Sequence, residues 1–82
     1  MEITEIKLKI KGIVGGMFDL PPGDISDSKP FPEMAKYDSM RALEFLAKLE
    51  NEFNVTIDPD VLVKMNTVEG AAGVIQGMIH AS

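Results

Sequence analysis

The pattern of apolar and polar positions divides the chain into helical segments separated by loops. In residues 3–17 the apolar side chains recur at steps of three and four, which is the spacing of one face of an amphipathic helix. These side chains are Ile3, Ile6, Ile10, Ile13, Val14 and Met17. Residues 6–11 alternate strictly between apolar residues and lysine, a pattern that would also suit a half-buried strand. The longer window favours a helix.

The segment from Asp19 to Pro32 is predicted to be a long loop. Four prolines and a glycine lie among its Asp and Ser residues, so neither a helix nor a strand can continue through it. Its isolated apolar residues are expected to attach the loop to the core; they are Leu20, Ile25 and Phe31. A loop of this length in so small a domain is often functional or specifically packed.

A second helix is predicted from Ser39 to about Asn54, with Asp38 or Ser39 as its cap. Its predicted apolar face consists of Met40, Leu43, Leu46, Ala47, Leu49 and Phe53. Its predicted outer face consists of Arg41, Glu44, Lys48, Glu50, Asn51 and Glu52. One side of this helix is therefore expected to face the core, and the other to face solvent or a partner.

Two further helices are predicted in the C-terminal third. Asp58 suits an N-cap and Pro59 the first helical position, so a short helix is expected through Met65, burying Val61, Leu62 and Met65. Thr67 then caps a last helix with apolar residues at Val68, Ala71, Ala72, Ile75, Met78 and Ile79. Gly70, Gly73 and Gly77 each weaken this helix by up to about 1 kcal/mol relative to alanine.

The predicted fold class is all-α: a four-helix bundle with a long loop between helices one and two and a short third helix. Its 82 residues are well short of the length at which chains split, so residues 1–82 are expected to form a single domain. The long first connection suits a crossover better than a simple up-and-down bundle. The initiating Met1 and the absence of a linker lead us to expect a free-standing protein, with excision from a longer synthase as the alternative. We also expect a monomer.

Charge restricts the class of partner. Eight basic against thirteen acidic side chains give a formal charge of -5, the wrong sign for binding nucleic acid or an anionic membrane surface. A basic surface on another protein is the natural complement. The sequence has no apolar run of about 18 residues and no signal-peptide pattern, so a cytoplasmic location is expected.

Catalytic and metal-binding residue types are scarce. The chain has no Cys and a single His, His80, close to the C-terminus. This composition excludes a disulfide framework and a thiolate or multi-His metal site. A catalytic triad needs a base held beside its nucleophile. We therefore expect neither a metal site nor an enzyme.

Asp38-Ser39-Met40, at the predicted start of the second helix, is the strongest candidate for chemistry. The N–H groups of the first turn and the helix dipole favour an anion at this point, so a phosphodiester on the Ser39 hydroxyl would be stabilised. Asp and Ser are also among the commonest helix caps. The tripeptide alone therefore fits either an attachment site or a cap.

Several motifs in a common register resemble the acyl carrier proteins, whose signature is Asp-Ser-Leu at the start of the second of four helices. Here the signature has Met in place of Leu. The other matching positions are Phe31, Leu43-Glu44-Phe45, Leu49-Glu50-Asn51-Glu52-Phe53, Ile57 and Thr67-Val68. The match runs without a gap to the C-terminus. Any one of these motifs is weak, but their common register is specific.

The resemblance implies a carrier. A transferase would move phosphopantetheine from coenzyme A onto Ser39, beside Asp38, and acyl groups would then be held as thioesters on the thiol of this arm. The implied partners are a phosphopantetheinyl transferase, an acyltransferase or acyl ligase, and a ketosynthase. Partner contacts would come from Met40, Glu44, Glu50 and Glu52. Met40 could equally be a core residue, and exposed Glu residues are often only solvated surface.

Two departures from the family pattern favour a specialised carrier, for polyketide or related secondary metabolism, over one for fatty acid synthesis. Ala35-Lys36-Tyr37 replaces the usual Leu-Gly-x before the signature, and Arg41 stands where an acidic residue is common. An aminoacyl or D-alanyl carrier and a non-carrier helical interaction domain remain alternatives. Tyr37 could touch the arm or a partner, or pack on Phe31 or the loop prolines. The small residues of the last helix could line a cleft for cargo or simply form core.

Overall fold

The computed structural model describes residues 2–33 and 37–81. It has three α-helices, α1 (Ile3–Phe18), α2 (Ser39–Phe53) and α3 (Val68–Ala81), and three 3-10 helices, η1 (Pro22–Asp24), η2 (Phe31–Glu33) and η3 (Pro59–Met65). The described residues contain no strand, so the helix predicted for residues 3–17 is confirmed and the strand alternative is wrong. The predicted short third helix is present as η3, in 3-10 rather than α form.

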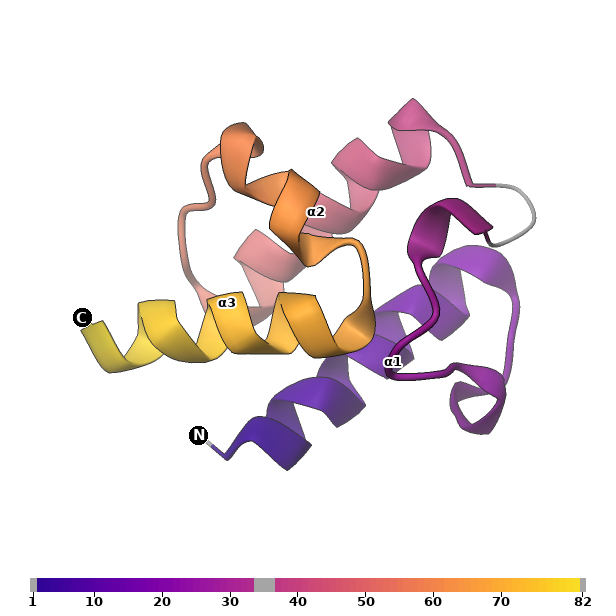
Figure 1. The fold of residues 1–82 in the computed structure, drawn as a ribbon, viewed down its shortest axis with the longest axis horizontal. Helices are drawn as coiled ribbons and strands as arrows, with labels where there is room; N and C mark the ends of the chain where they lie inside the picture. Colours follow the sequence, from indigo (N-terminus) through magenta and orange to yellow (C-terminus); the bar gives the residue numbers. More distant parts are fainter. Residues whose placement is uncertain (1, 34–36, 82) are drawn as a thin grey trace.

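The helices enclose one core. In Figure 1, α1 and α3 lie next to each other at the bottom, while α2 and η3 cover them from above. Both termini are at the left of this view, and α2 begins at the upper right. The largest fully buried side chains are Ile6, Ile10, Leu49, Met65, Ile75, Val14 and Val68. They come from α1, α2, η3 and α3, so every predicted helix contributes to the core.

Three of the predicted helix caps are confirmed. Asp38 Oδ1 accepts the backbone N–H of the third residue after it at 2.8 Å. Asp58 Oδ1 accepts the backbone N–H of the second residue after it at 2.9 Å. Thr67 Oγ1 accepts the backbone N–H of the third residue after it, also at 2.9 Å. Each bond satisfies an N–H group that the first helical turn leaves without a partner, which is why these helices begin where they do.

The apolar face predicted for α2 is partly wrong. Met40, Leu43 and Ala47 are exposed, and the buried residues of α2 are Ala42, Phe45, Leu46, Leu49 and Phe53. The aromatic ring at Phe45 decides the rotation of the helix, because it packs edge-on against Phe31 with ring centroids 5.1 Å apart. Turning this ring inward places Met40 and Leu43 on the outer side of α2.

The long loop is attached to the start of α3 by backbone hydrogen bonds. The Phe31 N–H donates to the Asn66 carbonyl at 2.6 Å, and the Glu69 N–H donates to the Asp27 carbonyl at 2.9 Å. The predicted anchors Ile25 and Phe31 are buried. The third predicted anchor, Leu20, is wrong, since its side chain is 38% exposed.

Asp27 also joins the loop to α1 through its side chain. Its carboxylate forms ion pairs with Lys11 at 2.5 Å and with Lys7 at 3.4 Å. The hydrogen bond from Lys11, with a smaller contribution from Lys7, holds the pKa of Asp27 below its ordinary value. A lowered folded-state pKa stabilises the fold above the unfolded pKa of about 3.9, and this contribution disappears as pH falls through the folded value.

We expect Asp27→Asn to lower the melting temperature at pH 7 by up to about 5 °C, because half-exposed ion pairs contribute below about 1 kcal/mol. The difference from wild type should shrink as pH falls below about 4 and through the lowered pKa of folded Asp27, because the wild-type carboxylate then becomes protonated as well. Thermal unfolding between about pH 3 and 7 measures both effects. Asp24→Asn, at an exposed position of the same loop, is the control. A difference that persists unchanged at pH 3 would contradict the role of the charge.

Candidate functional site

Ser39 is the first residue of α2 and is exposed. The cap of this helix is the side chain of Asp38, which has an extended backbone and accepts the Arg41 N–H. The Ser39 hydroxyl therefore plays no part in the cap. Of the two roles that the sequence left open for the tripeptide, the structure assigns capping to Asp38 and leaves the hydroxyl of Ser39 at the surface.

A groove of about 480 Å³ lies at the start of α2 and is lined by Asp38, Met40, Arg41 and Glu44. The positive end of the helix dipole points toward this region, which suits a singly charged phosphodiester on the neighbouring hydroxyl. An exposed serine at a helix N-terminus beside an open groove thus fits a covalently attached phosphopantetheine arm.

Tyr37 holds the segment that leads into Ser39 against the end of α1. Its ring stacks on Phe18, with centroids 6.4 Å apart and an angle of 18° between the ring planes. Burial raises the pKa of the Tyr37 phenol. The sequence analysis predicts that Tyr37 packs within the fold, and it does: the ring that it stacks on is Phe18, and it lies against the core. The departure at Ala35-Lys36 lies outside the described residues.

The three acidic residues predicted to recognise partners all have partners within the fold. Glu44 Oε2 lies 3.3 Å from Arg41 Nη1. Glu50 Oε2 accepts the backbone N–H of Ile57 at 2.8 Å, which ties the end of α2 to the segment before η3. Glu52 Oε1 lies 3.9 Å from the Lys9 ammonium on α1. The half-buried Glu50 is thus a structural residue, a role that its charge and helical position alone do not reveal.

Glu50→Ala is expected to destabilise the protein by about 1–2 kcal/mol, because it leaves the partly buried Ile57 N–H without its charged acceptor. Glu52→Ala is the matched control on the same helix. It should change the free energy of unfolding by less than about 0.5 kcal/mol, since its long, exposed ion pair contributes little. Urea unfolding of the two variants measures the difference, and equal effects would contradict the structural role of Glu50.

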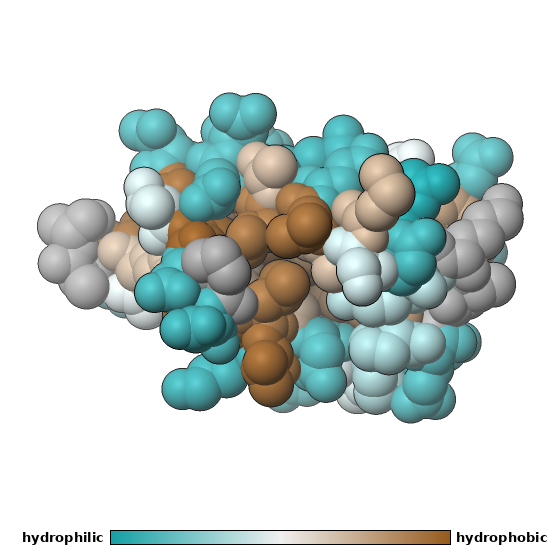
Figure 2. Space-filling view, turned by 90° about the horizontal axis from the view of Figure 1, so that it is seen from above, coloured by the Kyte–Doolittle hydropathy of each residue, from teal (hydrophilic) through white to brown (hydrophobic). Residues whose placement is uncertain are grey.

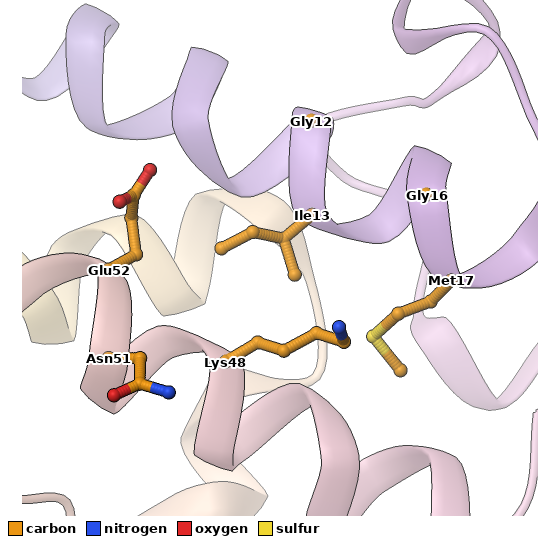
Figure 3. Close-up of a pocket in the computed structure, with 7 residues that line it drawn as sticks. All are labelled: Gly12, Ile13, Gly16, Met17, Lys48, Asn51 and Glu52. Carbon is orange, nitrogen blue, oxygen red and sulfur yellow. The ribbon is translucent and has the colours of Figure 1, made fainter.

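Among the residues that the structure describes, two further grooves lie away from Ser39. The first groove, of about 460 Å³, runs between α1 and α2. It is lined on the α1 side by Gly12, Ile13, Gly16 and Met17, and on the α2 side by Lys48, Asn51 and Glu52. Figure 3 shows the Lys48 side chain extending across this groove toward Met17. The second, of about 380 Å³, joins the ends of α2 and α3 and includes Met78 and Ile79. Of the residues proposed as a cleft wall on α3, Val68, Ala71, Ala72 and Ile75 are buried in the core instead.

Within residues 2–33 and 37–81, no group of three or more His, Asp or Glu side chains could hold a metal ion. No helix in this part of the chain is long and apolar enough to cross a bilayer. His80 belongs to the last turn of α3, and Figure 1 places this end of α3 at the left, opposite the beginning of α2. The sole imidazole therefore stands far from Ser39.

Comparison with known proteins identifies the class. The family model for the phosphopantetheine attachment site matches residues 8–75. The chain is 36% identical to polyketide-8 synthase acyl carrier protein 1 of Streptomyces avermitilis, over 84% of this chain and 82% of that protein. It is 30% identical to an acyl carrier protein of Thermosynechococcus vestitus, over 99% of this chain and all of the other.

Two solved structures have the same fold as this chain. An acyl carrier protein from Enterococcus faecalis superposes with a TM-score of 0.79 at 27% identity, covering 95% of this chain and 99% of that one. A domain of the CurA module from Lyngbya majuscula gives a TM-score of 0.81 at 17% identity, covering 98% and 81%, and shows the shared fold.

The chain belongs to the family of phosphopantetheine-dependent carriers. Within this family it is an acyl carrier protein, with phosphopantetheine as its covalently bound prosthetic group. Proteins of this family carry acyl groups rather than catalyse reactions, and pathway enzymes act on them. The alternative of a non-carrier helical interaction domain is not favoured.

Proposed function

We propose that Ser39 is the residue to which phosphopantetheine is attached. The observation that carries this proposal is the division of roles at the start of α2, where Asp38 caps the helix and the exposed Ser39 hydroxyl does not. A phosphodiester on Ser39 would lie at the positive end of α2, beside the open groove. The arm would supply a terminal thiol that holds an acyl group as a thioester.

Attachment joins Ser39 Oγ to the phosphopantetheine phosphorus of coenzyme A and releases the adenosine bisphosphate half of that molecule. A base must accept the hydroxyl proton. Asp38, the nearest carboxylate in sequence, is engaged as the helix cap, and His80 belongs to the far end of α3. The base is therefore proposed to come from the transferase, and this chain acts as carrier and not as enzyme.

The proposed pathway is polyketide or related secondary metabolism. Support comes from the 36% identity to a carrier named for a polyketide synthase. Arg41 adds to it, because the resemblance to acyl carrier proteins implies an acidic residue at this position in a carrier of fatty acid synthesis. The proposed partners are a phosphopantetheinyl transferase, an acyltransferase or acyl ligase, and a ketosynthase. Because these steps draw on coenzyme A, we propose that the protein acts in the cytoplasm.

The test is intact mass followed by peptide mapping. The purified chain is incubated with coenzyme A, magnesium and a phosphopantetheinyl transferase of broad specificity. We expect the mass of a single phosphopantetheine to be added, and the modified peptide to carry it on Ser39. Addition at another serine would overturn the assignment of Ser39, and no addition to a folded chain would overturn the carrier function proposed for it.

A further inference from the structure

The groove between α1 and α2 is open because two glycines of α1 line it. Gly12 and Gly16 are exposed, and a Cβ at either position would have nothing within 4 Å. A glycine inside a helix is less favourable than alanine, and here its missing side chain leaves a hollow of about 460 Å³. The opposite wall consists of Lys48, Asn51 and Glu52 of α2. We call this hollow the α1–α2 groove.

The α1–α2 groove follows α2 in the direction that leads away from Ser39. Tyr37, just before α2, stacks on Phe18 at the end of α1. Glu52, near the end of α2, pairs with Lys9 in the first half of α1. The two helices are therefore antiparallel, and the groove between them runs from the Ser39 end of α2 toward the Glu52 end.

The groove is within reach of a group attached to Ser39. Lys48 lies nine residues after Ser39, which is about 14 Å along the axis of α2. The phosphopantetheine arm is a chain of about fourteen bonds from the serine oxygen to the sulfur. Three bonds of an extended peptide span about 3.5 Å, so the arm reaches about 16 Å. Arg41 and Glu44 line the groove beside Ser39 and share one side of α2 with Lys48, because residues three or four apart are neighbours on a helix.

The lining of the α1–α2 groove suits the arm, which alternates between amide groups and short apolar segments. Figure 3 shows the Lys48 side chain extending across the groove toward Met17. The Lys48 ammonium forms no ion pair with a described residue, whereas Glu44, one turn earlier, pairs with Arg41. It offers three N–H donors to the carbonyl oxygens of the arm. The half-buried Ile13 and Met17 offer contact to its methylene groups. The volume is in the range of small-ligand sites.

Apolar surface alone would not single out this groove. Figure 2 shows hydrophobic side chains also gathered along the middle of the face seen from above. The small side chains of α3 are fully buried in the core, so entry of the arm there would require packed side chains to move; they are Ala71, Ala72 and Ile75. The α1–α2 groove is already open, presents a cation, and lies on a path that starts at Ser39.

We propose that the α1–α2 groove holds the phosphopantetheine arm between encounters with enzymes, with Lys48 donating to its carbonyl oxygens. The inference rests on the proposed function, because the arm must start at Ser39. Tethering gives the arm an effective concentration at the groove of about millimolar, so weak contacts are enough to keep it there for much of the time. An enzyme that uses the arm must offer it a better site than this groove.

The thiol of the arm reports its position. The chain has no cysteine, so the loaded protein has a single thiol, and the pH dependence of its alkylation rate gives its pKa. A thiol beside an ammonium ionises more readily. Lys48→Met is therefore expected to raise the thiol pKa by about half a unit. The other charged side chain of the groove, Glu52, pairs with Lys9 at the far end. Lys64→Met, at an exposed position of η3, is the matched control and should leave the pKa unchanged.

Filling the groove tests the same contact without removing a charge. Gly16→Leu should displace the arm from Lys48 and raise the thiol pKa by about the same half unit. Gly73→Leu is the matched control, because Gly73 is also an exposed helical glycine with nothing within 4 Å of a Cβ. It should leave the thiol pKa unchanged. Intact mass shows that each variant is loaded, and melting temperatures close to wild type show that each is folded.

Amide chemical shifts of the loaded and unloaded chain locate the arm independently. We expect differences at Gly12, Gly16 and Lys48 in addition to those near Ser39. Differences confined to the first turn of α2, or found in the core at Ala71 instead, would overturn the inference while leaving attachment at Ser39 intact. A thiol pKa that neither Lys48→Met nor Gly16→Leu changes would do the same. A wild-type chain that accepts no phosphopantetheine would remove the proposed function, and this inference with it.

Discussion

Replacing Ser39 with alanine is expected to abolish covalent loading with phosphopantetheine, because it removes the hydroxyl oxygen that we propose is joined to the phosphate. The fold should hardly change. Asp38 supplies the cap, and alanine is a better helix former than serine, so the free energy of unfolding should stay within about 0.5 kcal/mol of wild type. Intact mass after incubation with coenzyme A and transferase measures loading, and urea unfolding measures stability.

Two variants make this result specific. Asp38→Ala removes the cap and should destabilise the protein by about 1 kcal/mol while keeping the serine available for loading. Ser28→Ala, at an exposed position of the long loop, should leave both loading and stability unchanged. Loading that survives in Ser39→Ala would place the attachment at another residue. A loss of stability in Ser39→Ala as large as that in Asp38→Ala would show that Ser39 is a cap after all.

Gly70→Ala is expected to destabilise the protein by about 2–3 kcal/mol, although alanine favours a helix over glycine. A Cβ at this position would lie 2.6 Å from the Lys64 carbonyl oxygen and 3.1 Å from Thr67 Oγ1. The first atom belongs to the backbone of η3, so the first turn of α3 would have to move away from it. This movement would strain the neighbouring hydrogen bond from the Glu69 N–H to the long loop.

Gly73→Ala is the matched control on the same helix. Nothing lies within 4 Å of a Cβ at this exposed position, so the substitution should stabilise the protein by up to about 1 kcal/mol. Thermal and urea unfolding of both variants give the comparison. Stabilisation by Gly70→Ala would contradict the close approach of α3 to η3. The sequence analysis gives Gly70, Gly73 and Gly77 an intrinsic cost of up to about 1 kcal/mol each; at Gly70 the close approach of η3 is expected to outweigh this cost.

Features set by residues near one another in the chain could be predicted from the sequence. The caps at Asp38, Asp58 and Thr67 are hydrogen bonds across two or three residues, so residue types and spacing located Asp58 and Thr67 and narrowed the cap of α2 to Asp38 or Ser39. The helical repeat of apolar residues in 3–17 similarly located α1 and its buried side. The position of Ser39 at the start of α2 followed from the same local pattern.

Features that depend on residues far apart in the chain could not be predicted. The apolar residues of α2 allow two overlapping faces, and only the contact of Phe45 with Phe31 leaves Met40 and Leu43 at the surface. Tyr37 meets Phe18 across the long loop, and the Glu50 carboxylate turns back to the Ile57 N–H. Periodicity along a helix limits which faces can be buried, but it does not say which neighbour each face will meet. The sequence by itself determined where the helices begin and where Ser39 stands, whereas tertiary packing decided what surrounds Ser39, because that depends on how the helices rotate against one another.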